Sequence, residues 1–248
     1  MSPALVLVAH GSRDPRFGAT ARRVRDAVAA TLPGVEVVLS YLDLDEPLVG
    51  DALDATEGET GRAGAGGDPV VVPLLLSAGY HHKVDLPAII AAHRPFAHQT
   101  DVIGTRSFTA ALADRLLEAG LDERDGVVLS AVGSSDESAD GHVRRRAIEL
   151  STYLHRPVEV VFATKLGPGN RAVAAAVRRL RAAGAQRIAL SPYFLSAGLL
   201  IERVETALDA LAEETLVAGP LGAHPDVIEG ICGLYRTAAQ RRTVIAGR

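Results

Sequence analysis

The chain repeats part of its own sequence, and this repeat limits the possible folds more than any other feature. The segment PLLLSAG at 73–79 returns as PYFLSAG at 192–198, and AHGSRDP at 9–15 is answered by AVGSSDE at 131–137. The matching segments follow one another in the same order in each half of the 248 residues. A repeat of this kind indicates a duplicated structural unit, so we expect two similar lobes.

Runs rich in Val, Ile and Leu alternate along the chain with stretches that have the helical spacing of apolar residues. The run VVVPLLLS at 70–77 is apolar almost throughout, which is typical of a parallel strand covered by helices on both faces. We therefore predict the α/β class, with a four-stranded parallel sheet flanked by helices in each lobe. Strands are expected at 4–9, 35–41, 69–77, 101–104, 126–132, 158–164, 187–195 and 215–219.

A polar segment, LDERDG at 121–126, follows an expected helix at 106–120 and precedes the first strand of the second half. It indicates a boundary between an N-terminal lobe at 1–122 and a C-terminal lobe at 123–248, which we expect to face each other across a cleft. The glycine-rich segment 57–68 is expected to be a surface connector. Because one chain carries both lobes, a functional monomer is the expected state.

Charge and hydropathy exclude several classes of partner. The formal net charge is −4, so the chain has no basic field to hold a phosphate backbone, and nucleic acid is not an expected partner. Apolar runs stay shorter than the roughly 18 to 20 residues of a membrane span. The start, MSPALVLVAHGS, lacks the basic flank of a signal peptide. We therefore expect a cytoplasmic protein that does not enter a membrane.

Two histidines are the strongest candidates for chemistry. Cys232 is the only cysteine, so a metal site would have to be built from histidines and carboxylates. His10 and His81 follow strands of the first half, whereas the second half has Val132 and Leu200 at the matching positions. Parallel sheets bind ligands at the carboxyl ends of their strands, and neutral imidazole suits Fe, Co, Ni and Zn. A lone histidine is more often structural, but this pair predicts a transition-metal site in the first half.

Three carboxylates lie near this pair in the expected fold. Asp85 is four residues after His81, where it could orient the imidazole or cap the following helix. Asp43 and Glu46 follow the second strand in YLDLDEP at 41–47, and either could bind the metal or accept a proton. Glu46 fits a helix-starting carboxylate better, and Asp43 fits the site better.

Arg13 is the best candidate for binding the carboxylates of a substrate, because a guanidinium group grips a carboxylate through two parallel hydrogen bonds. The basic run at 144–146 is better explained as a solvated helix face, since consecutive residues point around a helix. Tyr80, next to His81, could lie against a flat ligand or simply pack with its hydroxyl hydrogen-bonded.

Four segments together carry a family resemblance: HGSRDP at 10–15, YLDLDEP at 41–47, PLLLSAGYHHKVDLP at 73–87 and PYFLSAG at 192–198. With them, nearly the whole chain resembles the sirohydrochlorin chelatases, a branch of the ATP-independent class II chelatases. The resemblance implies insertion of Co²⁺ or Fe²⁺, with Ni²⁺ as a further option, into a sirohydrochlorin-type tetrapyrrole of cobalamin or siroheme biosynthesis. It implies no cofactor beyond that metal, and the sequence contains no GxxxxGK[ST] loop for ATP.

The resemblance also implies roles for individual residues. In the family, the histidine of H-G-S-R and that of G-x-H-x-x-x-D-[IL]-P bind the incoming metal, which implies His10 and His81 rather than the adjacent His82. A glutamate is common where this chain has Asp43, whose shorter side chain is expected to be a third ligand or the proton acceptor. The residues expected to bind the tetrapyrrole are Ser12, Arg13 and Tyr80.

Two other functions stay open from the sequence. A metal or tetrapyrrole carrier would keep the same residues and lack turnover. A histidine-dependent phosphohydrolase also begins with a strand followed by H-G, but it has an arginine before the histidine, where this chain has Ala9. A chelatase, for its part, needs a metal that is held but not caged, a bent macrocycle, and a base for two pyrrole protons.

Overall fold

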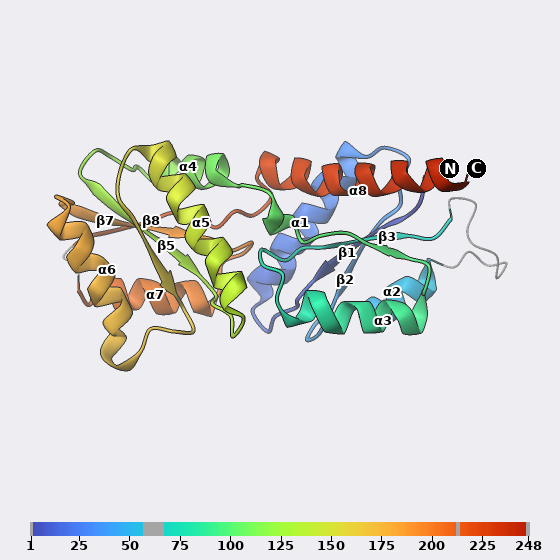
Figure 1. Ribbon diagram of the computed structural model, residues 1–248, viewed down its shortest axis with the longest axis horizontal. Helices are drawn as coiled ribbons and strands as arrows, with labels where there is room; N and C mark the ends of the chain where they lie inside the picture. Colours follow the sequence, from blue (N-terminus) through green and yellow to red (C-terminus); the bar gives the residue numbers. More distant parts are fainter. Residues whose placement is uncertain (1, 57–66, 212–213, 247–248) are drawn as a thin grey trace. The chain divides into compact units, whose positions relative to one another are not determined.

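The computed structural model contains two compact units (Figure 1). The residues that it describes are 2–56, 67–211 and 214–246. Unit 1 comprises Met1–Arg106 and Pro225–Arg248, and unit 2 comprises Ser107–His224. The glycine-rich connector expected at 57–68 lies mainly outside the described residues.

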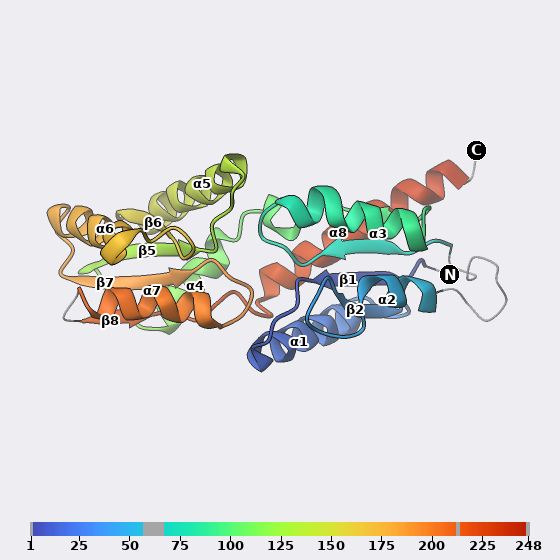
Figure 2. The same cartoon turned by 90° about the horizontal axis from the view of Figure 1, so that it is seen from below.

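Unit 1 is built on the strands β1 (Leu5–Ala9), β2 (Val37–Tyr41), β3 (Val70–Pro73) and β4 (His98–Gln99). Its main helices are α1 (Pro15–Thr31), α2 (Val49–Ala55), α3 (Leu86–His93) and α8 (Pro225–Ala246). The sheet is all parallel in the order β2-β1-β3-β4, with α1 and α8 on one face and α2 and α3 on the other (Figures 1 and 2). Because side chains alternate along a strand, Val6 and Val8 of β1 both pack against α2 and α3.

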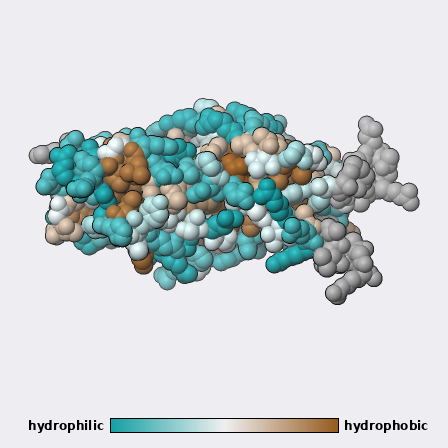
Figure 3. Space-filling model, turned by 90° about the horizontal axis from the view of Figure 1, so that it is seen from above, coloured by the Kyte–Doolittle hydropathy of each residue, from teal (hydrophilic) through white to brown (hydrophobic). Residues whose placement is uncertain are grey.

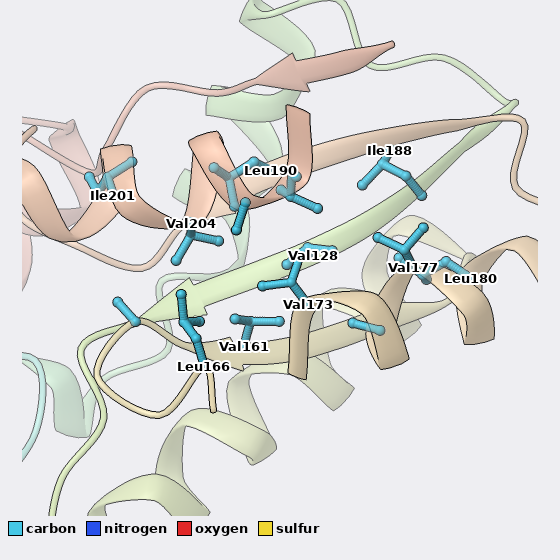
Figure 4. Close-up of a cluster of buried hydrophobic side chains, with 14 residues drawn as sticks. Val128, Val161, Leu166, Val173, Val177, Leu180, Ile188, Leu190, Ile201 and Val204 are labelled. Carbon is cyan, nitrogen blue, oxygen red and sulfur yellow. The ribbon is translucent and has the colours of Figure 1, made fainter. Parts of the chain in front are cut away.

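Unit 2 repeats this plan with the strands β5 (Asp125–Ala131), β6 (Val158–Phe162), β7 (Arg187–Pro192) and β8 (Thr215–Val217). Its helices are α4 (Thr109–Glu118), α5 (Glu137–Leu154), α6 (Arg171–Ala182) and α7 (Leu199–Asp209). The sheet is all parallel in the order β6-β5-β7-β8, which is the order of unit 1. Helices α6 and α7 cover the face on which Val128, Val161 and Ile188 form a buried core (Figure 4). The expected α/β class and the two four-stranded parallel sheets are therefore confirmed.

The division into units differs from the boundary expected between 1–122 and 123–248, because two helices belong to the opposite half of the chain. Helix α4 precedes that boundary but packs against α5 and β7 of unit 2. Helix α8 ends the second half but packs against α1 and β3 of unit 1. The hydroxyl of Tyr235 on α8 donates to the carbonyl of Pro3 at 2.7 Å, which fixes this helix beside the start of β1. Each sheet is thus encoded in one half, and the last helix of each half completes the other unit.

The strand expected at 101–104 is wrong. Strand β4 occupies His98–Gln99 instead, and Ile103–Thr105 forms a single 3-10 turn. Val102 and Ile103 are fully buried. Their apolar character therefore reflects packing of this turn rather than an extended backbone.

The helices and the surface can be compared with what a membrane span requires. Among the residues that the structure describes, no helix is long and apolar enough to cross a membrane. The face seen in Figure 3 is mostly hydrophilic, and its hydrophobic side chains form small groups separated by polar ones. Scattered groups of this kind are ordinary on protein surfaces.

Candidate metal centre

The two histidines singled out by the sequence meet at one edge of the unit 1 sheet. His10 directly follows β1, and His81 begins a π-helical turn, His81–Asp85, that follows β3. Since β1 and β3 are neighbouring parallel strands, both residues leave the sheet at the same edge. Their Nε2 atoms lie 3.2 Å apart, and the two rings meet edge to face with centroids 4.7 Å apart.

The other nitrogen of each ring faces an oxygen that can only accept a hydrogen bond. Nδ1 of His81 lies 2.7 Å from a carboxylate oxygen of Asp85, and Nδ1 of His10 lies 3.2 Å from the carbonyl oxygen of Gly11. Each Nδ1 therefore carries a proton in the neutral ring, which leaves the lone pair on Nε2. The two nitrogens that remain available as ligands, the Nε2 atoms, are the pair that lies 3.2 Å apart.

The separation of these nitrogens suits a shared metal ion. At the metal–nitrogen distance of about 2.05 Å that is usual for imidazole, this spacing corresponds to a nitrogen–metal–nitrogen angle of about 103°, close to the tetrahedral value of about 109°. The side chain of His81 is half exposed, so a metal bound there stays open on its outer side. Two protein ligands hold a metal less tightly than the four of a closed structural site.

Asp43 does not join this pair. Its carboxylate accepts the backbone N–H of Leu44 at 2.8 Å, and the described residues contain no group of three His, Cys, Asp or Glu placed to hold one metal ion. The structure therefore brings His10 and His81 together but leaves Asp43 exposed in the adjacent loop. Glu46 is exposed in the same loop, and α2 begins after it, at Val49.

The loop that carries Asp43 is fastened to the loop that carries His10. The backbone N–H of Asp43 donates to the carbonyl of His10 at 3.0 Å, and the N–H of Ser12 donates to the carboxylate of Asp45 at 2.9 Å. Gly11, at φ +96°, approaches so closely that a Cβ there would lie 1.6 Å from the Asp43 carbonyl oxygen. Asp45 was not predicted from the sequence as a site residue. The one sequence feature that pointed to it is its place two residues after Asp43 in the same acidic segment.

The residues expected to bind substrate have different surroundings. The hydroxyl of Ser12 accepts a hydrogen bond within its own turn, from the N–H of Asp14 at 3.1 Å. Arg13 is exposed. Tyr80 is 66% exposed, and its ring stands edge-on to that of His81 with centroids 6.5 Å apart. Arg13 and Tyr80 are thus free to contact a ligand at this edge.

His82 points away from the pair. The amide nitrogen of Gln99 on β4 lies 2.9 Å from Nδ1 of His82 and donates to the carbonyl of the same residue at 3.0 Å. Burial lowers the pKa of His82, so this imidazole stays neutral at pH 7. The two adjacent histidines therefore have different partners, Asp85 for His81 and Gln99 for His82.

The equivalent edge of unit 2 carries no imidazole pair among its described residues. Val132 follows β5 where His10 follows β1, and Leu200 takes the place of His81 on α7. Val132 is 46% exposed, so its edge is open to solvent as well. The same strand geometry therefore exists twice, with an imidazole pair in one copy.

Comparison with known proteins finds a matching family model and two similar curated proteins. A family model described as CbiX matches residues 4–119 and 126–238. The chain is 27% identical over 246 residues to a sirohydrochlorin cobaltochelatase of Priestia megaterium, covering 90% of this chain and 75% of the relative. It is 26% identical over 256 residues to a sirohydrochlorin ferrochelatase of Bacillus subtilis, covering 96% and 93%.

Solved structures agree with these matches. SirB from Bacillus subtilis with Fe³⁺ has a TM-score of 0.78 and 25% identity, covering 96% of both chains. SirB from Bacillus subtilis subspecies spizizenii in complex with cobalt has a TM-score of 0.74 and 22% identity, covering 97% of this chain and 96% of that one. The second match shows a shared fold.

Proposed function

The chain belongs to the CbiX family, and from this premise we propose that it inserts a divalent metal ion into sirohydrochlorin. The observation that carries the proposal is the 3.2 Å approach of the Nε2 atoms of His10 and His81 at an open edge of the sheet. The curated relatives named as cobalto- and ferrochelatases support the substrate. Imidazole suits several transition metals, and the names of the two relatives favour Co²⁺ or Fe²⁺ among them.

His10 and His81 hold the metal before insertion. Two imidazoles leave at least two tetrahedral positions for water and, later, for pyrrole nitrogens. As the pyrrole nitrogens bind, the weak two-ligand hold lets the metal leave the protein. Asp85 keeps the Nδ1 proton of His81 in place, so that Nε2 remains the ligand atom.

The acidic loop after β2 takes up the pyrrole protons. Insertion of a divalent ion releases two protons from the macrocycle, and a carboxylate near the metal accepts them directly or through water. Asp43 is exposed, and its backbone is bonded to the carbonyl of His10. We assign it this role in preference to that of a third ligand, because its carboxylate is turned toward the Leu44 N–H.

Two exposed side chains of unit 1 bind the tetrapyrrole near the metal. The ring of Tyr80 offers a flat apolar surface beside His81, against which a macrocycle can stack. Arg13 offers a guanidinium group to the acidic substituents. Because one chain carries both units, the active species is a monomer.

Anaerobic absorbance tests the proposal. Metal-free sirohydrochlorin is mixed with Co²⁺ or Fe²⁺, with and without the full-length chain, and the rate of change of its absorption bands is followed. A rate above the no-protein control, abolished in His10→Ala, supports a chelatase. Tight binding of the tetrapyrrole without acceleration by either metal would instead indicate a carrier.

A further inference from the structure

One acid at the sheet edge of unit 1 ties two loops together. The carboxylate of Asp45, in the loop after β2, accepts the backbone N–H of Ser12 at 2.9 Å, two residues after His10. Asp45 is partly buried, whereas the neighbouring Asp43 and Leu44 are exposed. The Asp45 side chain therefore joins the loop that carries Asp43 to the turn that carries His10.

The loop around Asp45 has a strained backbone. The N–H of Asp45 donates to the carbonyl of Asp43 at 2.9 Å, so Leu44 is the middle residue of a three-residue turn. Leu44 has φ +66°, a region that residues with a Cβ rarely adopt. Such a conformation persists only where surrounding contacts hold it, and the bond from Ser12 to Asp45 is one of these contacts. Loss of this bond is expected to let the loop relax and to move Asp43 with it.

The sheet edge of unit 2 makes the same turn with an acceptor from another element. Ser134 matches Ser12, since the hydroxyl of each accepts the N–H two residues later. The N–H of Ser134 donates at 2.9 Å to Asp140, which lies on α5. The loop after β6, ATKLGPGNR at 163–171, contains two basic residues and no acid. The turn therefore needs an acceptor, but the loop does not have to supply it.

The residue that takes the place of Asp45 in unit 2 belongs to the hydrophobic core. The N–H of Asp43 in unit 1 and that of Thr164 in unit 2 each donate to the carbonyl of the residue that directly follows the first strand. Two residues further on, Leu166 stands where unit 1 has Asp45, and it is buried (Figure 4). The acid that links loop and turn thus occurs in the unit with the imidazole pair and is replaced by a leucine in the other.

We infer that Asp45 is a positioning residue for metal insertion, which holds the Asp43 loop against the His10 turn so that Asp43 can take up a pyrrole proton. The inference rests on the proposed function for the role of Asp43. Asp45 acts through Asp43 rather than on the substrate, because its own carboxylate accepts the Ser12 N–H. Positioning matters here because a small misplacement of a group that transfers protons slows the reaction.

Asp45→Ala in the full-length chain tests this inference in the anaerobic metallation assay with Co²⁺. Its kcat is expected to fall about tenfold, as in Asp43→Ala, while the affinity for Co²⁺ alone stays within about threefold because both imidazoles remain. Asp45→Asn keeps an oxygen that accepts the Ser12 N–H and should restore most of kcat. Asp51→Ala removes an exposed acid from the first turn of α2 and should keep kcat within about twofold of wild type.

The arrangement of unit 2 offers a rescue that separates positioning from support of the turn. Gly18 on α1 has the place that Asp140 has on α5, six residues after the serine of the turn. The atoms nearest to a Cβ at Gly18 belong to the guanidinium group of Arg22, at 3.4 Å or more. Gly18→Asp/Asp45→Ala therefore returns an acceptor to the turn but leaves the loop untied. The thermal midpoint should recover and kcat should stay about tenfold low, whereas Gly18→Asp alone keeps kcat within about twofold.

A double-mutant cycle identifies the residue through which Asp45 acts. Asp43→Ala/Asp45→Ala should be no slower than Asp43→Ala alone, because a residue that only positions Asp43 has no effect once that carboxylate is gone. Losses that multiply to about 100-fold would overturn the inference.

The remaining outcomes are distinguishable. The inference is overturned if kcat recovers together with the thermal midpoint in Gly18→Asp/Asp45→Ala, or if Asp45→Ala keeps kcat within about twofold. The proposed function then stands, provided that wild type accelerates metallation; if it does not, both fall. Should Asp45→Ala not fold, the rescued variant supplies a folded chain without Asp45, and failure of both to fold would make Asp45 a structural residue and overturn the inference.

Discussion

The sheet edge of unit 1 ends in two imidazoles and an acidic loop, whereas the same edge of unit 2 ends in Val132, Leu200 and a basic loop. Strand order and strand direction are otherwise identical in the two sheets. Because the two units share one topology, the sheet edge of unit 2 can be compared residue by residue with that of unit 1. Residues that recur in both copies are candidates for maintaining the turns, and residues that differ are candidates for chemistry that belongs to one copy.

Ser12 shows how this comparison works. Its hydroxyl accepts the N–H of Asp14 at 3.1 Å, and the hydroxyl of Ser134 accepts the N–H of Asp136 at the same distance. Unit 2 makes this bond without an imidazole pair, so the bond belongs to the turn rather than to the metal centre. Contact between Ser12 and the substrate stays a prediction.

The largest effect is expected from removing the nitrogen ligands of unit 1. His10→Ala and His81→Ala should each lower the metallation rate at least about 100-fold, because one imidazole alone does not retain the metal. The rate is measured by absorbance, and circular dichroism checks that the fold is kept.

His82→Ala is the matched control for this change. Its ring contacts Gln99 instead of His10, so the metallation rate should fall by much less. An equal loss in His82→Ala would contradict the assignment of ligands.

A glycine pair tests whether the shared frame is equally tight in both units. In Gly11→Ala the new Cβ meets the Asp43 carbonyl oxygen at 1.6 Å, whereas in Gly133→Ala the nearest atom is the Thr164 hydroxyl oxygen at 2.7 Å. A backbone carbonyl blocks the new atom in the first case, whereas in the second the Thr164 hydroxyl and the Phe162 Cβ, at 2.9 Å, approach it much less closely. We expect Gly11→Ala to destabilise the fold by more than about 3 kcal/mol and Gly133→Ala by about 1 to 2 kcal/mol.

Thermal unfolding of the two glycine variants checks this order. Both positions have φ near +90°, so the strain of a left-handed residue is common to both, and the difference reports the close approach. Equal midpoints would show that the loops of unit 1 are no tighter than those of unit 2.

A third effect concerns the hydrogen bond between Asp85 and His81. Unit 2 has no such bond, because Leu200, which takes the place of His81, has no nitrogen in its side chain. Asp85→Asn removes the charge that holds the Nδ1 proton of His81 and should weaken Co²⁺ binding about tenfold. Isothermal titration under nitrogen measures the affinity. An unchanged affinity would mean that packing of the π-helical turn alone orients the ring.

The smallest effect is expected at Asp43. Asp43→Ala should leave Co²⁺ affinity within about threefold of wild type, because the carboxylate faces Leu44, and should slow metallation about tenfold through loss of a proton acceptor. Binding and rate are measured on the same preparation. A loss of affinity as large as that of His81→Ala would restore Asp43 as a third ligand.

Most of the fold could be predicted from the sequence. Apolar runs and the repeated P-x-x-L-S-A-G segment marked both sheets, because buried parallel strands need continuous apolar stretches. That α4 packs in unit 2 and α8 in unit 1 could not be predicted, because the apolar face of a helix does not indicate which sheet it covers. The strand predicted at 101–104 was wrong because the residues of a buried 3-10 turn are as apolar as those of a short strand.

The site could be predicted less completely. His10 and His81 stood out because their counterparts are Val132 and Leu200, and the structure brings them together. The sequence left two roles open for Asp85, orienting the His81 ring and capping the following helix. In the structure its carboxylate contacts His81 and makes no capping bond to α3, which favours the first role. The pairing of Lys165 with Asp140 joins a loop to a helix, a contact that sequence spacing does not encode.

The most direct test of the difference between the units is X-ray absorption at the cobalt edge, on the full-length chain loaded anaerobically with one equivalent of Co²⁺. Two imidazole ligands are predicted for wild type, one for His81→Ala and none for the double variant His10→Ala/His81→Ala. Two imidazoles that persist in the double variant would contradict the account, because the metal would then be bound outside the edge of the unit 1 sheet.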